Sequence, residues 1–311
     1  MTADRLTALL PVPAAIDGGL ATELEARGHD LRHQLWSARL LASDPDAIRE
    51  VHLAYFRAGA RVAISASYQA SRTGFRAVGM DADEADELLC RSVRLAQQAR
   101  DQASAEGVRG PLLVAASVGP YGAIRHDGSE YRGHYDIPRS ELSAFHAERL
   151  EVLADAGPDL LAVETIPDVV EAEVLVEQLA AFGQIPAWVS FSCADESRTC
   201  AGQPFAEAVA VAVSSPSTVA VGVNCSAPQH VEGLLAAART VTDLPLVVYP
   251  NAGGTWDAAT GMWADNVSKD LPPELVRRWV AAGAALVGGC CGLGPDAVSG
   301  IAQALVALAE R

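Results

Sequence analysis

The sequence lacks the features that would place it in a membrane or on nucleic acid. Its N-terminus has no basic segment followed by a long apolar one, so we expect no secretory signal. No uninterrupted apolar run approaches the roughly 18 residues that a membrane span needs. The chain has 23 Lys and Arg residues against 39 Asp and Glu residues, and the basic residues form no cluster. These absences predict a cytoplasmic protein with no membrane or nucleic-acid partner.

We also expect no disulfide bonds, no interdomain linker and no metal site built from histidines. The six cysteines would stay reduced in the cytoplasm, so we expect them to be buried, catalytic or metal-binding. His126, His134 and His146 have no metal-ligand spacing and are predicted to lie on the surface or in loops. No Pro/Ser-rich linker or low-complexity tract divides the 311 residues. We therefore expect residues 1–311 to form a single domain with a large core.

Apolar runs of strand length alternate with amphipathic stretches along the chain. The runs are mostly continuous rather than alternating, which is typical of strands buried on both faces. The predicted strands span residues 14–17, 61–67, 112–118, 159–164, 187–192, 218–224, 246–249 and 284–289. The predicted helices span residues 45–58, 83–105, 140–156, 169–181, 205–213, 229–240, 273–282 and 295–308. This pattern predicts a (β/α)8 TIM barrel, with an open doubly wound sheet as the alternative.

Two predicted loops are long, at residues 119–138 and 251–272. In such barrels the chemistry takes place at the C-terminal ends of the strands, where both loops would lie. We interpret them as candidate lids.

Three cysteines lie at predicted strand ends. Cys225 ends the sixth strand, and Cys290 and Cys291 follow the eighth between glycines. They could supply three thiolates to a zinc ion and leave one position open. Plain burial of cysteine and a strained vicinal disulfide are the alternatives. Cys193 lies near another strand end, where we expect it not to be a ligand.

The charge of such a centre indicates its chemistry. Three thiolates on Zn²⁺ leave a net charge of about −1 by simple counting, which makes a poor Lewis acid for activating water. A substrate thiol, by contrast, could bind as a thiolate and remain nucleophilic, because coordination deprotonates a group with an ordinary pKa near 8.5. The three cysteines therefore favour sulfur alkylation over hydrolysis.

Carboxylates and other polar groups occupy further strand ends. Asp17 follows the first strand and Glu164 ends the fourth. Either could hold an ammonium group, although Asp17 could instead be a turn residue and Glu164 an internal ion-pair partner. Backbone amides near Gly18 could bind a carboxylate. Ser67 and Asn224 complete the predicted substrate site, with a plain turn residue as the alternative for Asn224.

The motifs together resemble the homocysteine S-methyltransferase family, especially its bacterial S-methylmethionine-type members. The resemblance runs over nearly the whole chain. The matching stretches are residues 17–24, 66–70, 117–123, 130–133, 164–165, 222–225, 248–251 and 288–291.

The resemblance implies a TIM barrel that holds zinc through Cys225, Cys290 and Cys291. It implies methyl transfer from S-methylmethionine or S-adenosylmethionine to the zinc-bound thiolate of L-homocysteine, forming methionine. It further implies that Asp17 and Glu164 contact the homocysteine amine. One departure concerns residues 252–254, which read Ala-Gly-Gly where close relatives often have Ser-Gly-Glu, and this leaves the donor open.

Two other functions would fit parts of the sequence. A phosphate-binding barrel would use the glycine-rich segment 288–294, but no Lys or Arg occurs between Arg278 and Arg311, and the cysteines would have no role. A non-catalytic zinc- or thiol-binding barrel remains the alternative to an enzyme.

Overall fold

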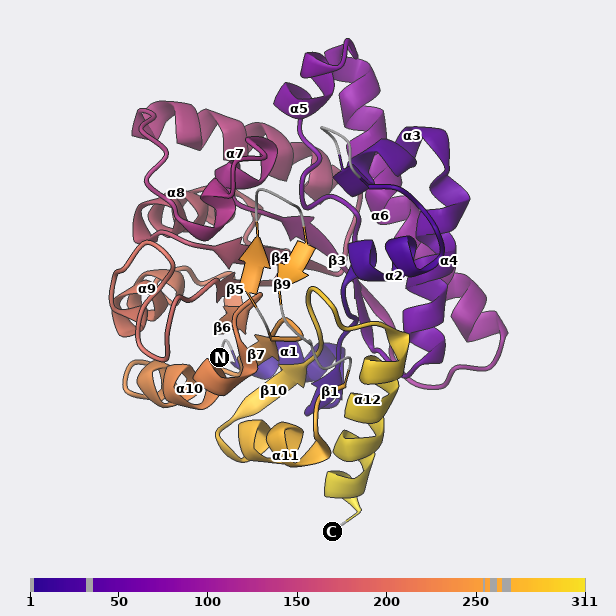
Figure 1. Ribbon diagram of the computed structural model, residues 1–311, viewed down its shortest axis with the longest axis vertical. Helices are drawn as coiled ribbons and strands as arrows, with labels where there is room; N and C mark the ends of the chain where they lie inside the picture. Colours follow the sequence, from indigo (N-terminus) through magenta and orange to yellow (C-terminus); the bar gives the residue numbers. More distant parts are fainter. Residues whose placement is uncertain (1–2, 32–35, 254, 258–261, 265–269, 311) are drawn as a thin grey trace.

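The computed structural model describes residues 3–31, 36–253, 255–257, 262–264 and 270–310. Eight parallel strands form one sheet in the order β1-β10-β7-β6-β5-β4-β3-β2 (Figure 1). Their bounds are β1 Ala14–Ala15, β2 Val62–Ile64, β3 Leu113–Val118, β4 Leu160–Ile166, β5 Ala187–Phe191, β6 Thr218–Asn224, β7 Leu246–Tyr249 and β10 Ala284–Val287. Each lies within or overlaps one of the predicted strands.

The first and second strands close the sheet into a barrel. The Arg61 N–H donates to the Ala15 carbonyl at 2.7 Å, and the Asp17 N–H donates to the Val62 carbonyl at 3.1 Å. Ile16 and Val62 pair in parallel at the same point. The predicted (β/α)8 barrel is confirmed. The alternative, an open doubly wound sheet, is wrong because β1 and β2, the two end strands of the sheet, are hydrogen-bonded to each other.

Helices surround the barrel in the order that the sequence predicts (Figure 1). The expected helices are α4 Pro45–Arg57, α6 Ala82–Ala105, α7 Arg139–Asp155, α8 Val169–Leu179, α9 Phe205–Ala212, α10 Val231–Arg239, α11 Pro273–Ala281 and α12 Pro295–Ala309. Four more were not predicted: α1 Ala3–Leu9, α2 Leu20–Ala26, α3 Leu40–Ser43 and α5 Arg72–Ala77. These are too short for a clear helical period. None of the described helices has the length and apolar character needed to cross a bilayer.

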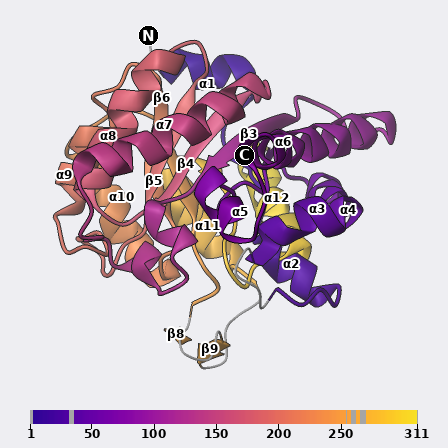
Figure 2. The ribbon, with the colours of Figure 1, turned by 90° about the horizontal axis from the view of Figure 1, so that it is seen from above.

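Helix α1 covers the N-terminal end of the barrel. Leu6 and Leu10 are buried in the same apolar cluster as Ile16, Trp188 and Leu286 from the strands. Figure 2 shows α1 and the hairpin of β8 (Thr255–Asp257) and β9 (Met262–Ala264) on opposite sides of the barrel. One end of the barrel is thus sealed by apolar side chains, and the other remains available for a pocket.

We expect Leu6→Ala to lower the free energy of unfolding by about 2–5 kcal/mol, because it opens a cavity in this seal. Chemical denaturation at equilibrium measures the change. Val306→Ala, at a side chain that is 59% exposed, is the control and should stay within about 0.5 kcal/mol. Equal stability of the Leu6 variant and the control would mean that α1 does not seal the barrel.

Both long loops carry local structure. Residues 119–138 contain two short 3-10 turns, Tyr121–Ile124 and Ser129–Tyr131. Residues 251–272 contain the β8–β9 hairpin, but positions 254, 258–261 and 265–269 lie outside the described residues. A lid role for either loop stays a prediction.

Candidate active site

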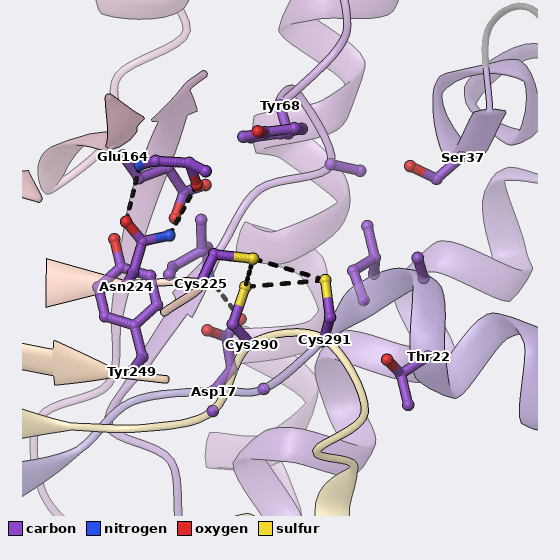
Figure 3. Close-up of a pocket in the computed structure, with 18 of the residues that line it drawn as sticks. Asp17, Thr22, Ser37, Tyr68, Glu164, Asn224, Cys225, Tyr249, Cys290 and Cys291 are labelled. Carbon is purple, nitrogen blue, oxygen red and sulfur yellow. Dashed lines mark hydrogen bonds between the residues drawn. The ribbon is translucent and has the colours of Figure 1, made fainter. Parts of the chain in front are cut away.

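The strand ends opposite α1 surround one pocket (Figure 3). Seven of the predicted site residues line it: Asp17, Gly18, Glu164, Asn224, Cys225, Cys290 and Cys291. Tyr68 and Tyr131 line it as well, and Tyr131 was not among the residues that the sequence pointed to. No Lys, Arg or His is among the described residues that line the pocket. Cationic ligands therefore suit it, and a phosphate group does not.

The three cysteine sulfurs meet at the floor of this pocket. The Sγ atom of Cys225 lies 3.0 Å from that of Cys290 and 3.6 Å from that of Cys291. The sulfurs of Cys290 and Cys291 are 4.0 Å apart, and all six cysteines are free thiols. Zn–S bonds of about 2.3 Å in a tetrahedral site put sulfurs about 3.8 Å apart. The observed triangle therefore fits one metal ion, and the vicinal disulfide is wrong.

Close backbone approach brings the cysteine loop against the end of the first strand. A Cβ atom at Gly288 would lie 2.6 Å from the Asp17 carbonyl oxygen, and one at Gly18 would lie 2.4 Å from that of Leu293. Only glycine leaves room for these contacts. The Thr22 hydroxyl, on α2, then accepts a hydrogen bond of 2.9 Å from the Gly292 N–H. Asp17 and the cysteines consequently share one wall of the pocket.

Hydrogen bonds among the three sulfurs favour the thiolate at Cys291 and the protonated thiol at Cys225 and Cys290, whose pKa values are raised. The pKa of Cys291 lies well below its ordinary value because Cys225 and Cys290 donate hydrogen bonds to its sulfur. The Tyr131 hydroxyl lies 3.2 Å from the Cys225 sulfur. Cys193 is buried near the end of β5 but lies outside the triangle, in line with its predicted non-ligand role.

Asp17 and Glu164 are buried carboxylates without a cationic partner among the described residues. Asp17 Oδ2 accepts from the Ile64 N–H at 2.7 Å, whereas Oδ1 has no partner in the described structure. Burial raises the pKa of Asp17 well above its ordinary value. Burial also raises the pKa of Glu164 to about 7, although the Ser117 hydroxyl donates to it. Both side chains would gain from a bound ammonium group.

Asn224, at the end of β6, holds the end of β4, which lies two strands away in the sheet. Its Oδ1 accepts from the Thr165 N–H at 2.7 Å and from the Ser190 hydroxyl at 2.9 Å. Its Nδ2 donates to the Thr165 hydroxyl at 2.7 Å. Thr165 has a φ of 60°, a left-handed value that is strained for a β-branched residue. Asn224 lines the pocket while fixing this strained turn directly after Glu164.

The structure places Ser67 behind the pocket wall. Its hydroxyl donates to the Ser117 carbonyl at 2.8 Å and lies 2.7 Å from the Ser65 hydroxyl. Ser65 lines the pocket instead. The difference arises because β2 ends at Ile64 and the chain turns at Ala66 and Ser67, whereas the predicted strand continued to residue 67. In a continued strand Ser65 and Ser67 would share one face, and the turn separates them.

We expect Asn224→Ala to reduce the free energy of unfolding by about 2–4 kcal/mol, because it leaves the buried Thr165 N–H without an acceptor. Thermal and denaturant unfolding would measure this loss. An unchanged stability would show that Thr165 keeps its conformation without the amide.

A TIM barrel with three convergent cysteine sulfurs and two unpaired carboxylates at its mouth defines a candidate thiolate metal centre in a barrel enzyme. A family model for homocysteine S-methyltransferase matches residues 14–305. Homocysteine S-methyltransferase 4 of Zea mays is 51% identical over 304 residues, covering 94% of this chain and 89% of that protein. The homocysteine S-methyltransferase of Escherichia coli (strain K12) is 46% identical over 288 residues, covering 92% and 93%.

A solved structure agrees with these sequence matches. The metallated form of the homocysteine methyltransferase MmuM from Escherichia coli superposes with a TM-score of 0.84 at 44% identity. The alignment covers 93% of this chain and 95% of that one. The chain belongs to the homocysteine S-methyltransferase family. The resemblance seen in its sequence and its prediction as an enzyme are thereby confirmed.

Proposed function

We propose that this protein is a zinc-dependent methyltransferase that moves a methyl group from a sulfonium donor to L-homocysteine, forming methionine. The donor would be S-methylmethionine or S-adenosylmethionine. The observation that carries the proposal is the convergence of the Cys225, Cys290 and Cys291 ligand atoms within 4.8 Å of one another at the barrel mouth. The names of the relatives, and the metallated form of one of them, support it.

The donor set favours zinc as the metal. Soft thiolate ligands select zinc over magnesium, calcium and manganese, and three protein ligands leave one position for a substrate atom. When bound, zinc would hold the homocysteine sulfur as a thiolate at neutral pH. The remaining contribution of the protein would be to position homocysteine and the methyl donor relative to each other.

The two buried carboxylates would bind and orient homocysteine. Its ammonium group would pair with the free Oδ1 atom of Asp17 and with Glu164, whose carboxyl group an adjacent cation would ionise. No described Lys or Arg competes for them in the pocket. Homocysteine would thus be held at its sulfur and at its amine, which sets the direction of attack.

The pocket also suits a cationic donor. A sulfonium group carries a positive charge, and the aromatic side chains of Tyr68 and Tyr131 line the pocket beside the sulfurs. Displacement of the methyl group releases a neutral thioether, which needs no general acid. The absence of histidine from the described pocket lining agrees with such a reaction.

The loop after β7 lies against the loop of Cys290 and Cys291. The Ala252 N–H donates to the Cys291 carbonyl at 2.8 Å, and the Gly253 N–H donates to Asn251 Oδ1 at 3.0 Å. Ala252 therefore touches the loop of Cys290 and Cys291 directly. This contact is consistent with an influence of residues 252–254 on the choice of donor.

Metal analysis combined with an activity assay tests the proposal. We expect about one zinc per chain in the reduced protein and methionine formation from homocysteine with at least one of the two sulfonium donors. Removal of zinc with a chelator should abolish the activity, and added zinc should restore it. A zinc-loaded protein that forms no methionine with either donor would support the non-catalytic barrel instead.

A further inference from the structure

One buried carboxylate holds both ends of the loop at residues 119–138. Glu171, on α8, is 1% exposed, and its Oε1 atom accepts a hydrogen bond of 2.6 Å from the Tyr121 N–H. Its Oε2 atom accepts one of 2.8 Å from the Tyr135 hydroxyl. His146 Nε2 donates to Oε1 at 2.8 Å. His146 was predicted to lie on the surface or in a loop, but it lies on α7 and is fully buried, where its ring bonds to Glu171.

A second carboxylate fixes the same loop closer to its middle. Asp168 Oδ2 accepts from the His134 N–H at 3.1 Å, and Oδ1 accepts from Gln203 Nε2 at 2.9 Å. Gly133 packs so tightly that an added Cβ would lie 2.9 Å from Asp168. In this structure these hydrogen bonds make the loop one wall of the pocket, and its lid role stays a prediction.

This wall ends at the cysteine cluster. Tyr131 lies between the two anchored segments and lines the pocket, with its hydroxyl 3.2 Å from the Cys225 sulfur. Cys225 has a φ of 47°, so its backbone is in the left-handed region that few side chains adopt. A phenol carries its proton at neutral pH, and it is therefore the donor when Cys225 is a thiolate.

We propose that Tyr131 is a positioning residue that donates a hydrogen bond to the Cys225 thiolate, and that Glu171 sets its place by holding both ends of the loop. The proposal rests on the proposed function, because it requires Cys225 to be a metal ligand. The hydrogen bond fixes the direction of the sulfur and offsets part of the negative charge of a three-thiolate centre. Hydrogen bonds to metal ligands commonly change metal affinity or activity by 10–100-fold.

Tyr131→Phe removes this hydroxyl and keeps the ring. Tyr121→Phe is the matched control, since Tyr121 belongs to the same loop but its ring packs on Tyr135 and Phe145, away from the sulfurs. We expect the Kd for zinc, measured by chelator competition, to rise about 10-fold in Tyr131→Phe and to stay unchanged in Tyr121→Phe. In the cobalt-substituted protein, the sulfur-to-metal charge-transfer band should move to longer wavelength only in Tyr131→Phe, because the thiolate loses its hydrogen bond.

Glu171→Gln tests the anchoring with Tyr131 intact, and it serves the same purpose if Tyr131→Phe does not fold. We expect a smaller shift of the same band, because an amide nitrogen cannot accept from the Tyr135 hydroxyl. If Tyr131→Phe has the same Kd for zinc and the same band position as the wild type, the assignment of Tyr131 is overturned. The proposed function would still stand, because it does not depend on this hydrogen bond. A band that moves in Tyr131→Phe but not in Glu171→Gln would overturn the anchoring role. A wild-type protein that binds no cobalt or zinc would overturn the proposed metal site, and this assignment with it.

Discussion

Cys225→Ser is expected to lose its zinc and to reduce kcat/KM for methyl transfer by about 1000-fold or more. A serine hydroxyl stays protonated at neutral pH and is a poor ligand for zinc, so only two thiolates would remain. A 1000-fold loss corresponds to about 4 kcal/mol of transition-state stabilisation. Cys291→Ser should behave in the same way, because its sulfur completes the triangle with those of Cys225 and Cys290.

The measurement is zinc per chain together with steady-state kinetics on reduced protein. Cys90→Ser is the matched control: Cys90 lies on α6, does not belong to the described pocket lining, and its thiol donates to the Val152 carbonyl at 3.8 Å. It should keep both zinc and activity. Full zinc content and full activity in Cys225→Ser and Cys291→Ser would refute the metal site.

Glu164→Gln is expected to raise the KM for homocysteine about 100-fold and to change kcat little. The neutral amide keeps the size of the side chain and can still accept from Ser117, but it no longer pairs with an ammonium group. Loss of one buried charge pair costs about 2–3 kcal/mol in binding, which matches a change of this size. The ammonium contact is expected to be equally strong in the substrate complex and in the transition state, so its loss raises KM and leaves kcat nearly unchanged. A fall in kcat with unchanged KM would contradict the binding role of Glu164.

The same variant should be more stable than the wild type above pH 7. The pKa of Glu164 is about 7 in the fold and near 4.5 when the chain is unfolded, so folding favours the protonated carboxyl. The contribution is fully present below about pH 4.5 and is lost as the pH rises to about 7. At 1.36 kcal/mol per pKa unit, the difference amounts to about 3 kcal/mol.

Unfolding of the metal-free proteins between pH 4 and pH 8 measures this effect. The free energy of unfolding of Glu164→Gln should rise relative to that of the wild type by about 3 kcal/mol between pH 4 and pH 8, because the other titrating groups are common to both proteins and cancel in the difference. Glu207→Gln, at an exposed position on α9, is the control and should follow the wild type. Parallel curves for Glu164→Gln and the wild type would show that the carboxylate is not destabilising.

Local periodicity predicted the barrel well because the strands of a barrel are buried on both faces. A run such as Thr218–Asn224, which is buried throughout, is apolar enough to be found without any partner. The short helices α1 and α5 were missed because six or seven residues span fewer than two turns. Ser67 was wrongly expected in the site because the chain leaves β2 after Ile64 and turns at Ala66 and Ser67, three residues before the predicted strand end.

The sequence alone determined the strand and helix order, the cysteines at two strand ends and the carboxylates at two others, since each depends on residues adjacent in the chain. Only the tertiary structure decided that Tyr131 reaches Cys225, which is 94 positions away, and that Glu171 binds Tyr121, 50 positions away. Barrel closure brings strand ends to one mouth, as a rule of the fold. The path of a loop over that mouth follows no such rule. It depends on which buried polar groups find partners, and that is settled only when the whole chain is packed.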